Sequence, residues 1–312
     1  MDLTRHLHTF GYYLKQRYGE PVHKLSLAGG FTCPNRDGTL GRGGCTFCNV
    51  RSFGREAAEL SISQQLAREK RKTDRARKYL AYFQAYTSTY AEVETLRALY
   101  DEAVASADVV GLCVGTRPDC VPDAALDLLA SYQDKGSEVW LELGLQTAHD
   151  RTQALIRRGH TLADYQDAVQ RAHARGLKVC AHLIAGLPGE NAGDAHATLQ
   201  TVLDIGVEGL KLHPLMIVRG SRMAAQYRRG EVMPMVLDDY AELAASLIRH
   251  TPREVVYHRI SATAQAPTLI APEWCGPRWS ALQAIGERLA RDGGQGAALG
   301  GGWPARDCVS EY

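Results

Sequence analysis

The chain repeats one pattern six times: an apolar run typical of a buried strand, followed by a segment with helical spacing. The apolar runs are rich in β-branched and aromatic residues, as expected of strands buried on both faces. They lie near residues 22–28, 79–86, 109–115, 139–145, 178–186 and 209–218. Strands that alternate with helices predict an α/β protein with a parallel sheet. Periodicity alone does not distinguish an open sheet from a partial or complete barrel.

Two of the intervening helices have recognisable ends. Pro122 stands in the predicted first turn of one helix, and Gly136 ends it. Thr161 and Asp164 have the spacing of a capping box at the start of the next helix, and Gly176 ends that helix. Each helix therefore connects one predicted strand to the next, as a parallel sheet requires.

The two ends of the chain differ from this repeat. An amphipathic helix precedes the first strand, and the pattern after residue 220 changes to a helix near 238–250 and a strand near 255–262. A Gly-rich segment from 293 to 302 follows, which we expect to be loosely packed. We therefore divide the chain into a short N-terminal helix, an α/β core and a C-terminal extension, over residues 1–19, 20–256 and 257–312.

The composition limits the class of protein. Of 312 residues, 45% are hydrophobic and 23% are charged, which is typical of a soluble globular protein. No apolar run approaches the roughly 18 residues of a membrane-spanning helix. The first residues also lack the continuous apolar segment of a secretory signal, so we expect a cytoplasmic protein with no membrane partner. Because 36 basic residues are balanced by 35 acidic ones, a polyanion would have to bind a local patch.

Three of the eight cysteines form the most specific motif in the sequence. Cys33, Cys45 and Cys48 have C-x11-C-x2-C spacing in a loop directly after the first predicted strand. Glycines within this loop permit the tight turns that would bring three thiolates to one metal centre. A cubane iron–sulfur cluster normally takes four cysteines, so three would leave one iron open to another ligand. A structural zinc site, completed by a distant His or Cys, is the alternative.

This loop, KLSLAGGFTCPNRDGTLGRGGCTFC, resembles the radical S-adenosylmethionine (radical SAM) superfamily, and within it the YhcC-type group, which is similar to the catalytic subunit of eukaryotic Elongator. Nearly the whole chain takes part, through GTRPD, LELGLQTAHD, HLIAGLPGE and KLHPL over residues 115–119, 141–150, 182–190 and 211–215. The resemblance implies a partial parallel (β/α)6 barrel of TIM type, which agrees with the six predicted strands.

The resemblance also implies the cofactors. Cys33, Cys45 and Cys48 would hold a [4Fe-4S] cluster, whose open iron binds the amine and carboxylate of S-adenosylmethionine. An electron from the cluster, supplied by a donor such as flavodoxin or ferredoxin, would cleave this cofactor to methionine and a 5′-deoxyadenosyl radical. Many members of the superfamily place three residues between the first two cysteines, whereas eleven stand here. We expect this longer loop to leave cluster binding intact.

Polar side chains at the ends of the second and third predicted strands are candidate ligands. Thr87 and Ser88 are suited to the ammonium or carboxylate of the methionine moiety, although hydroxyls at a strand end also form turns. Arg117 follows the third strand, and its guanidinium suits a carboxylate of methionine or of an acidic substrate. We treat it as a candidate catalytic residue. The alternative is an ion pair with Asp119 or another acid.

The fourth strand contributes two further candidates. Glu142 and Gln146 have the acceptor and donor atoms that a ribose diol needs. Glu142 is the stronger of the two, because a carboxylate next to Leu141 and Leu143 is costly to bury without a partner. We expect both side chains to contact the cofactor.

The resemblance places the adenosine of the cofactor near the fifth and sixth strands. Gly186 of the fifth-strand segment permits close approach of the backbone, although Gly-x-x-Gly is also common in turns. His182 and His213 are each either a ligand or a core histidine with a satisfied ring. The backbone near 211–214 would meet the adenine edge, and Phe47, inside the final cysteine pair, would lie near the adenine.

The remaining cysteines are not spaced as a second cluster: Cys113, Cys120, Cys180, Cys275 and Cys308. Cys113 and Cys180 lie in apolar strands, where a buried thiol behaves as a small hydrophobic side chain. Cys120 and Cys275 fall in predicted loops, where either could donate a hydrogen atom or bind substrate.

Three basic segments make an RNA substrate plausible. Residues 68–78 hold seven basic and two acidic side chains, which suits a phosphate backbone but also a solvated helix face. A second basic region follows the last barrel strand and contains Arg219, Arg222, Arg228 and Arg229. The C-terminal part adds phosphate-binding and base-stacking candidates, namely His258, Arg259 and the segment from Trp274 to Trp279.

Two functions from different classes follow. The first is a radical SAM enzyme whose substrate is a tRNA wobble uridine side chain, as the Elongator resemblance implies, or a small molecule. We do not expect the separate acetyltransferase domain of Elongator in a chain of this length, so its specific carboxymethyl reaction is not carried over. The second is a non-catalytic RNA-binding or interaction protein in which the cysteines hold zinc.

Overall fold

Seven parallel strands form one curled sheet in the part of the chain that the structure, a computed structural model, describes: residues 2–49, 59–73 and 77–300. Their bounds are β1 Val22–Leu27, β2 Lys78–Phe83, β3 Val109–Thr116, β4 Glu138–Gln146, β5 Lys178–Ala185, β6 Gly209–Pro214 and β8 Val256–Arg259. The spatial order is β1-β2-β3-β4-β5-β6-β8, and each neighbouring pair is parallel. The predicted partial parallel barrel is confirmed.

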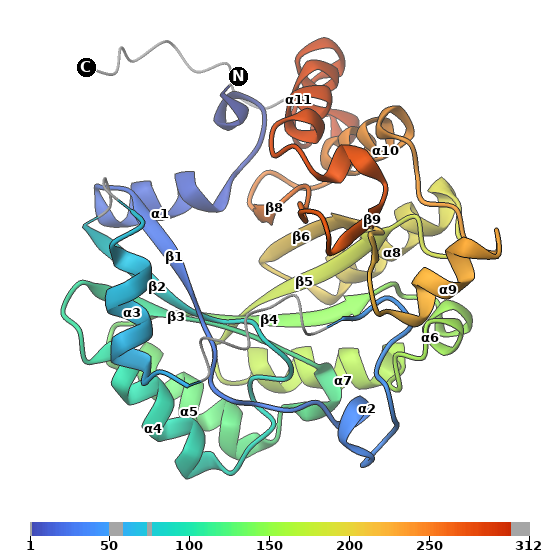
Figure 1. Ribbon diagram of the computed structural model, residues 1–312. Helices are drawn as coiled ribbons and strands as arrows, with labels where there is room; N and C mark the ends of the chain where they lie inside the picture. Colours follow the sequence, from blue (N-terminus) through green and yellow to red (C-terminus); the bar gives the residue numbers. More distant parts are fainter. Residues whose placement is uncertain (1, 50–58, 74–76, 301–312) are drawn as a thin grey trace.

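Helices cover the outer side of the curled sheet (Figure 1). Those that connect successive strands are α3 Ile62–Lys70, α4 Val93–Val104, α5 Asp123–Asp134, α6 Asp150–Leu155, α7 Leu162–His173 and α8 Ala192–Ile205, with α9 Arg222–Arg228 and α10 Leu237–Arg249 before β8 and α11 Ser280–Asp292 after it. α4 packs on β3, α5 on β4 and α7 on β5. Short 3-10 helices lie at Leu3–Arg5, Pro118–Cys120, Glu273–Cys275 and Ala297–Leu299.

The first α-helix, α1 (Phe10–Tyr18), packs on the opposite side of the sheet from these outer helices. Phe10 and Leu14 belong to an apolar cluster with Trp140 and other side chains of β2 to β5. α1 also contacts both β1 and β8, and the backbone N–H of Tyr257 donates to the carbonyl of His8 at 2.8 Å. α1 therefore bridges the first and last strands of the sheet.

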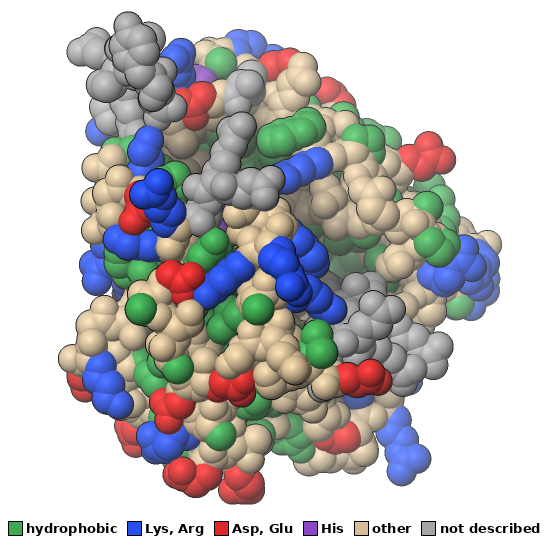
Figure 2. Space-filling model, turned by 60° about the vertical axis from the view of Figure 1, so that its left-hand side comes forward, with side chains coloured by type: hydrophobic (Ala, Val, Ile, Leu, Met, Phe, Trp, Pro, Cys, Tyr) green, Lys and Arg blue, Asp and Glu red, His purple; other side chains and the backbone are tan. Residues whose placement is uncertain are grey.

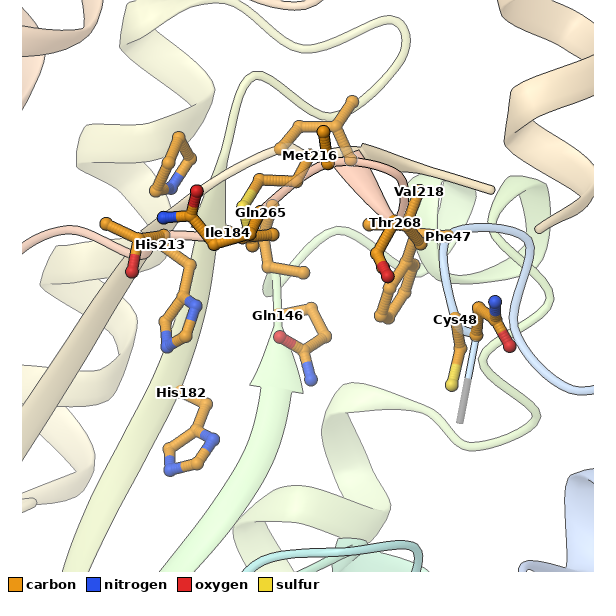
Figure 3. Close-up of a pocket in the computed structure, with 16 residues that line it drawn as sticks. Phe47, Cys48, Gln146, His182, Ile184, His213, Met216, Val218, Gln265 and Thr268 are labelled. Atoms are coloured by element: carbon orange, nitrogen blue, oxygen red, sulfur yellow. The ribbon is translucent and has the colours of Figure 1, made fainter. Parts of the chain in front are cut away.

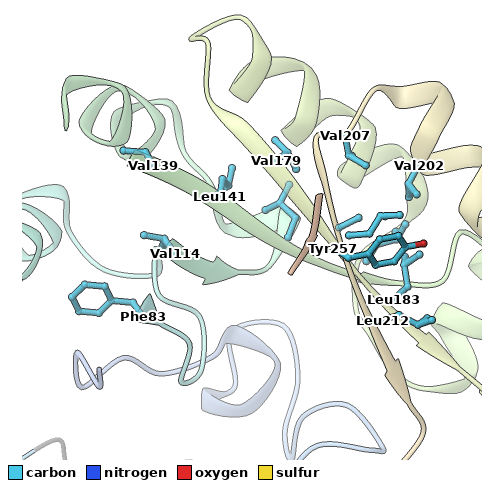
Figure 4. Packing of buried hydrophobic residues seen from close by; sticks show 14 of the residues in the cluster. Phe83, Val114, Val139, Leu141, Val179, Leu183, Val202, Val207, Leu212 and Tyr257 are labelled. Atoms are coloured by element: carbon cyan, nitrogen blue, oxygen red, sulfur yellow. The ribbon is translucent and has the colours of Figure 1, made fainter. Parts of the chain in front are cut away.

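The other face of each strand packs against the outer helices and forms the larger core (Figure 4). Val114, Val139, Leu141 and Val179 are all completely buried there. Because successive side chains of a strand point to opposite faces, Trp140 lies in the inner cluster while its neighbours Val139 and Leu141 face the helices. Burial on both faces explains the continuous apolar runs in the sequence.

The local signals that predicted the helices have clear structural counterparts. Thr161 and Asp164 form the predicted capping box of α7, and Gly176 beyond its end has a φ of +69°. Gly136 follows α5 with a φ of +90°, a left-handed conformation that favours glycine. Pro122 is the residue before α5 rather than part of its first turn, a shift of one residue.

Three features of the structure differ from the sequence prediction. The strand predicted near 255–262 joins the main sheet as β8, which makes seven strands instead of six. The run predicted near 209–218 divides after Pro214, where β6 ends, and the antiparallel pair β7 (Ile217–Val218) and β9 (Leu269–Ala271) follows. The Gly-rich segment is closely packed at residues 294–296, where the buried Gln295 side chain donates to the backbone carbonyls of Pro252 and Val255, whereas residues 298–300 are exposed.

The proposed division into three parts stays a prediction. β8 begins at the boundary drawn at residue 256 and completes the core sheet. In the described residues, we find no helix with the length and apolar character needed to cross a bilayer.

Leu141→Ala tests the packing between the sheet and the outer helices. We expect the free energy of unfolding to fall by about 2–5 kcal/mol, because a fully buried leucine leaves a cavity when it is truncated. Chemical denaturation monitored by circular dichroism would measure it. Leu155→Ala is the matched control, since Leu155 is 52% exposed and should change stability by less than about 0.5 kcal/mol. Equal losses in the two variants would contradict the packing described here.

Candidate active site

The loop that holds the cysteine array starts at the carboxyl end of β1. Cys33 immediately precedes the short helix α2 (Pro34–Asp37), and its carbonyl accepts a hydrogen bond from the backbone N–H of Arg36 at 2.8 Å. The Arg36 guanidinium donates to the carbonyl of Cys48 at 2.9 Å, and the N–H of Cys48 donates to the carbonyl of Cys45 at 3.1 Å. The turn at the first cysteine is thereby tied to the last.

All three cysteines line one cavity of about 170 Å³, which we name the cysteine cavity. No Asp or Glu is among the described residues of its wall, whereas three arginines are: Arg36, Arg117 and Arg158. Within the described residues, no three His, Cys, Asp or Glu side chains are grouped to bind one metal ion. The cysteines of an iron–sulfur cluster each bind a different iron, so this finding does not bear against a cluster here.

Two side chains that the sequence analysis missed contact the sulfur of Cys45. The amide nitrogen of Asn35 and a guanidinium nitrogen of Arg158 each lie 3.5 Å from it. Arg158 is buried, and its Nη2 and Nε donate to the carbonyl of Gly144 at 2.6 and 3.2 Å. Asn35 lies inside the cysteine loop and could have been proposed from that position. Arg158 is far away in sequence, and no spacing pointed to it.

Arg117 lines the cysteine cavity but already has protein partners. Its Nε and Nη2 donate to the carboxylate of Asp119 at 2.9 and 2.7 Å, and Nη1 donates to the carbonyl of Arg158 at 2.8 Å. The ion pair with Asp119, the alternative from sequence, is therefore present. The side chain is only 3% exposed, so a direct role for Arg117 toward substrate stays a prediction.

The hydroxyls of Thr87 and Ser88 are fully buried and have no hydrogen-bond partner in the structure. Thr87 lines the cysteine cavity, whereas Ser88 is not among its lining residues. A buried hydroxyl without a partner is costly, and this cost would be removed by a polar ligand in the cavity. Thr87 therefore has the geometry of a ligand-binding group.

A larger cavity of about 460 Å³ adjoins the cysteine cavity (Figure 3). Phe47, Cys48, Gln146 and His182 line both, so the two spaces meet at these side chains. In Figure 3, Gln146 lies between the two histidines on one side and Cys48 on the other. The structure thus brings together predicted site residues from the cysteine loop, β4 and β5. We name this space the nucleoside cavity, for the ligand proposed below.

The rest of the nucleoside cavity comes from β6 and from the segments around β7 and β9. His213 lines it, and its Nε2 is buried without a partner. Met216, residues 263–266 and Thr268 add a wall that the sequence analysis did not foresee, because their positions carry no motif. Gly186 is not among the lining residues; a Cβ built on it would come within 2.8 Å of Met235, so it permits that contact instead.

Glu142 lines neither cavity and lies in a buried network of ionisable side chains. Its carboxylate accepts hydrogen bonds from Lys24 and, at 2.9 Å, from Lys211. His182 Nε2 lies 2.8 Å from one oxygen, and His258 Nδ1 lies 3.0 Å from the other. The five residues come from β1, β4, β5, β6 and β8. Glu142 therefore already has protein partners, and its predicted contact with a ribose stays a prediction.

This environment fixes the charges in the network. Burial alone would raise the pKa of Glu142, but Lys211 and Lys24 hold it well below its usual range. Burial lowers the pKa of Lys211 to about 8 and that of His182 to about 4. His182 is therefore neutral near pH 7, with the proton on Nε2 toward the carboxylate and Nδ1 free to accept a hydrogen bond.

The first two basic segments of the sequence lie in different environments. Residues 74–76 of the first segment lie outside the described residues; of the others, Lys70 pairs with Asp108 and Lys72 with Glu69, as on a solvated helix face. The second region instead contacts the cysteine loop. Arg222 donates to the carbonyl of Arg42 at 2.8 Å, and the Arg219 carbonyl accepts from Asn49.

The cysteines outside the array are buried where the structure describes them. Cys113 and Cys180 are packed inside the sheet, as predicted. Cys120 and Cys275, predicted in loops, lie in short 3-10 helices and are also buried. Burial raises the pKa of each of these two thiols to about 12, so neither is a ready thiolate. Cys308 lies outside the described residues.

Comparison with known families decides the chemistry. Residues 33–202 match the model of the radical SAM superfamily, and residues 207–291 match that of the radical SAM C-terminal domain. The chain belongs to the radical SAM superfamily. It is therefore a radical enzyme that uses a [4Fe-4S] cluster and S-adenosylmethionine. This favours the enzymatic hypothesis over the zinc-stabilised interaction protein.

Relatives of this radical SAM enzyme cover the chain to different extents. Protein YhcC of Escherichia coli K12 is 58% identical over 97% of this chain and 98% of its own length. The tRNA uridine(34) acetyltransferase of Methanocaldococcus jannaschii is 26% identical over 52% of this chain and 30% of its own length. The structure of Elp3 from Methanocaldococcus infernus, with an N-terminal deletion, has a TM-score of 0.64 at 18% identity and covers 86% of this chain and 63% of that one, a match in fold.

Glu142→Gln tests the buried network. We expect the free energy of unfolding to fall by about 3–5 kcal/mol near pH 7, because Lys24 and Lys211 lose their buried anion. The lowered pKa of Glu142 gives stability that is present above its ordinary value of 4.5 and lost as the pH falls further. The difference between wild type and variant, measured by denaturation at several pH values, should therefore narrow below pH 4.5.

The matched control is Glu94→Gln, since the Glu94 side chain is exposed and pairs only with Arg97 among the described residues. Its effect should stay below about 0.5 kcal/mol. A loss in Glu142→Gln no greater than in this control would show that the network contributes no net stability.

Proposed function

We propose that Cys33, Cys45 and Cys48 ligate the [4Fe-4S] cluster of this radical SAM enzyme. The carrying observation is that all three line one cavity whose described wall holds arginines and no acid. A cluster with three thiolates is anionic, and N–H groups beside the sulfurs stabilise its charge and tune its potential. Asn35 and Arg158 supply such groups to Cys45.

The adjoining nucleoside cavity is the proposed site of S-adenosylmethionine. Thr87 has a buried, unpartnered hydroxyl for the methionine moiety, and His213 has an unpartnered Nε2 for the adenine or ribose. Phe47, Gln146 and His182 stand where the two cavities meet. When bound, the cluster supplies the electron that cleaves this cofactor to methionine and a 5′-deoxyadenosyl radical.

Glu142 then acts as a positioning residue rather than a ribose ligand. Its hydrogen bond at 2.8 Å holds the Nε2 side of His182, which fixes the ring and its tautomer at the cavity wall. Lys24 and Lys211 keep Glu142 ionised and hence able to accept that bond. An electron donor such as flavodoxin or ferredoxin would supply the electron to the cluster.

For the substrate, we propose the side chain of a tRNA wobble uridine. The support is the similarity over half of this chain to a protein named tRNA uridine(34) acetyltransferase. The surface is compatible with a polyanion, since Lys and Arg side chains gather near the middle of one face (Figure 2). Arg42 and Arg222 also lie exposed on and beside the cysteine loop. The activated substrate carbon would lie next to the cofactor.

Replacement of Cys33, Cys45 or Cys48 by Ala should abolish cluster binding, because each ligand holds a different iron. Iron content and the visible absorbance of anaerobically reconstituted protein would measure this. Cys275→Ala is the control, since that thiol is buried outside both cavities and should leave the spectrum unchanged. Full iron content in any of the three variants would remove that cysteine from the ligand set.

The RNA substrate predicts tRNA-dependent turnover. Reduced, reconstituted enzyme should release more 5′-deoxyadenosine with deacylated tRNA from cells that lack the gene than with no RNA. tRNA from cells that contain the gene should stimulate less, because its uridines are already modified. Chromatography of 5′-deoxyadenosine and nucleoside analysis of the tRNA would measure both. Identical release with and without either tRNA would argue for a small-molecule substrate.

A further inference from the structure

A further cavity, of about 490 Å³, lies between the start of α1 and the residues that follow β8; we name it the β8 cavity. Thr263 lines both the β8 cavity and the nucleoside cavity, so the two adjoin. Its wall includes Arg259 and Arg278 together with the hydroxyl residues Thr9 and Ser261. No Asp or Glu occurs among its described lining residues.

The two arginines of this cavity differ from most others near the active site. Arg117 pairs with Asp119, and Arg158 donates to a backbone carbonyl. Arg259 and Arg278 are exposed. Within the described residues, neither guanidinium group has a hydrogen bond or an ion pair to a carboxylate. Two unneutralised guanidinium groups on one acid-free wall favour an anionic ligand, and phosphate matches their planar donors.

An exposed aromatic ring stands beside this wall. Trp279 is 65% exposed, and the guanidinium carbon of Arg278 lies 4.9 Å from the centre of its ring. Nucleic-acid bases stack on exposed aromatic rings of this kind. Trp279 is not among the described lining residues of the β8 cavity, but its contact with Arg278 places the ring next to the cavity wall.

Two other candidates from this part of the sequence have partners inside the fold. His258 Nδ1 lies 3.0 Å from Glu142, but the ring also lines the β8 cavity and its buried Nε2 has no hydrogen-bond partner. Trp274 packs against Tyr240, with ring centroids 5.2 Å apart, and its indole N–H donates to the carbonyl of Met235 at 3.0 Å. Of the residues considered from sequence, Arg259, Trp279 and the Nε2 of His258 therefore stay available to a ligand.

We propose that the β8 cavity binds a backbone phosphate of the RNA substrate through Arg259 and Arg278, while Trp279 stacks on a neighbouring unpaired base. This inference rests on the proposed function and places the strand next to the nucleoside cavity. The contact through Thr263 would bring the nucleotide adjacent to the bound phosphate toward the cofactor. The proposed ligand is a single-stranded segment of that RNA.

The test is a fluorescence-anisotropy titration of cluster-loaded enzyme with a labelled anticodon stem-loop that carries an unmodified wobble uridine. Arg259→Gln and Arg278→Gln should each weaken binding about tenfold and lower the salt slope by about 0.7, the effect of one lost single-strand phosphate contact. Trp279→Ala should weaken binding by about tenfold while keeping the slope, since stacking is uncharged. Thermal melting confirms that each variant is folded.

Arg97→Gln is the matched control, because it removes an arginine from α4 on the outer side of the sheet and should bind RNA as the wild type does. Unchanged affinity and slope in both cavity variants would overturn this inference while the proposed function stands. If wild-type enzyme neither binds the stem-loop nor responds to tRNA, both fail together. Equal competition by uridine 5′-monophosphate would identify a free nucleotide and overturn the RNA assignment.

Discussion

The carboxylate of Glu142 is the interaction on which the interior of this half-barrel depends. It is completely buried, and side chains from β1, β5, β6 and β8 converge on it. A buried ion is tolerated only with partners of opposite charge and saturated hydrogen bonds, so the strands must keep their register for the network to exist. The network therefore couples the closure of the sheet to the placement of His182 at the cavity wall.

The site is assembled from elements that are distant in sequence. The cysteine loop follows β1, yet the sulfur of Cys45 is contacted by Arg158, which precedes α7. The same loop is fixed from another direction, since the N–H of Met223 donates to the carbonyl of Thr46 at 2.9 Å. The cysteine cavity therefore forms only where these distant segments meet, which makes its formation depend on the folding of the sheet.

The repeating elements and the cysteine array could be predicted from sequence because each has a local physical cause. Thr161 and Asp164 cap a helix within four residues, and the cysteine spacing is visible without any tertiary contact. Ion pairs between side chains of different strands have no such local cause. Lys24 and Lys211 lie in buried strands, where an unpaired ammonium group would be costly in free energy. Their positions therefore indicate a buried anion nearby. The sequence does not show that this anion is Glu142.

The same limit explains why Glu142 was expected at a ribose. Its burial among apolar residues correctly indicated a required partner, and both a ligand and the protein could supply one. The structure supplies it from within, through two lysines and two histidines. In contrast, Thr87 and His213 keep unpartnered buried atoms at the cavities, which no sequence pattern reveals.

The position of α1 has a consequence for the handling of a radical. This helix bridges β1 and β8 and packs on the inner face of the sheet, so it covers this flank except at the β8 cavity beside its start. An RNA strand bound there, as proposed above, would fill the remaining space and keep water away from the radical.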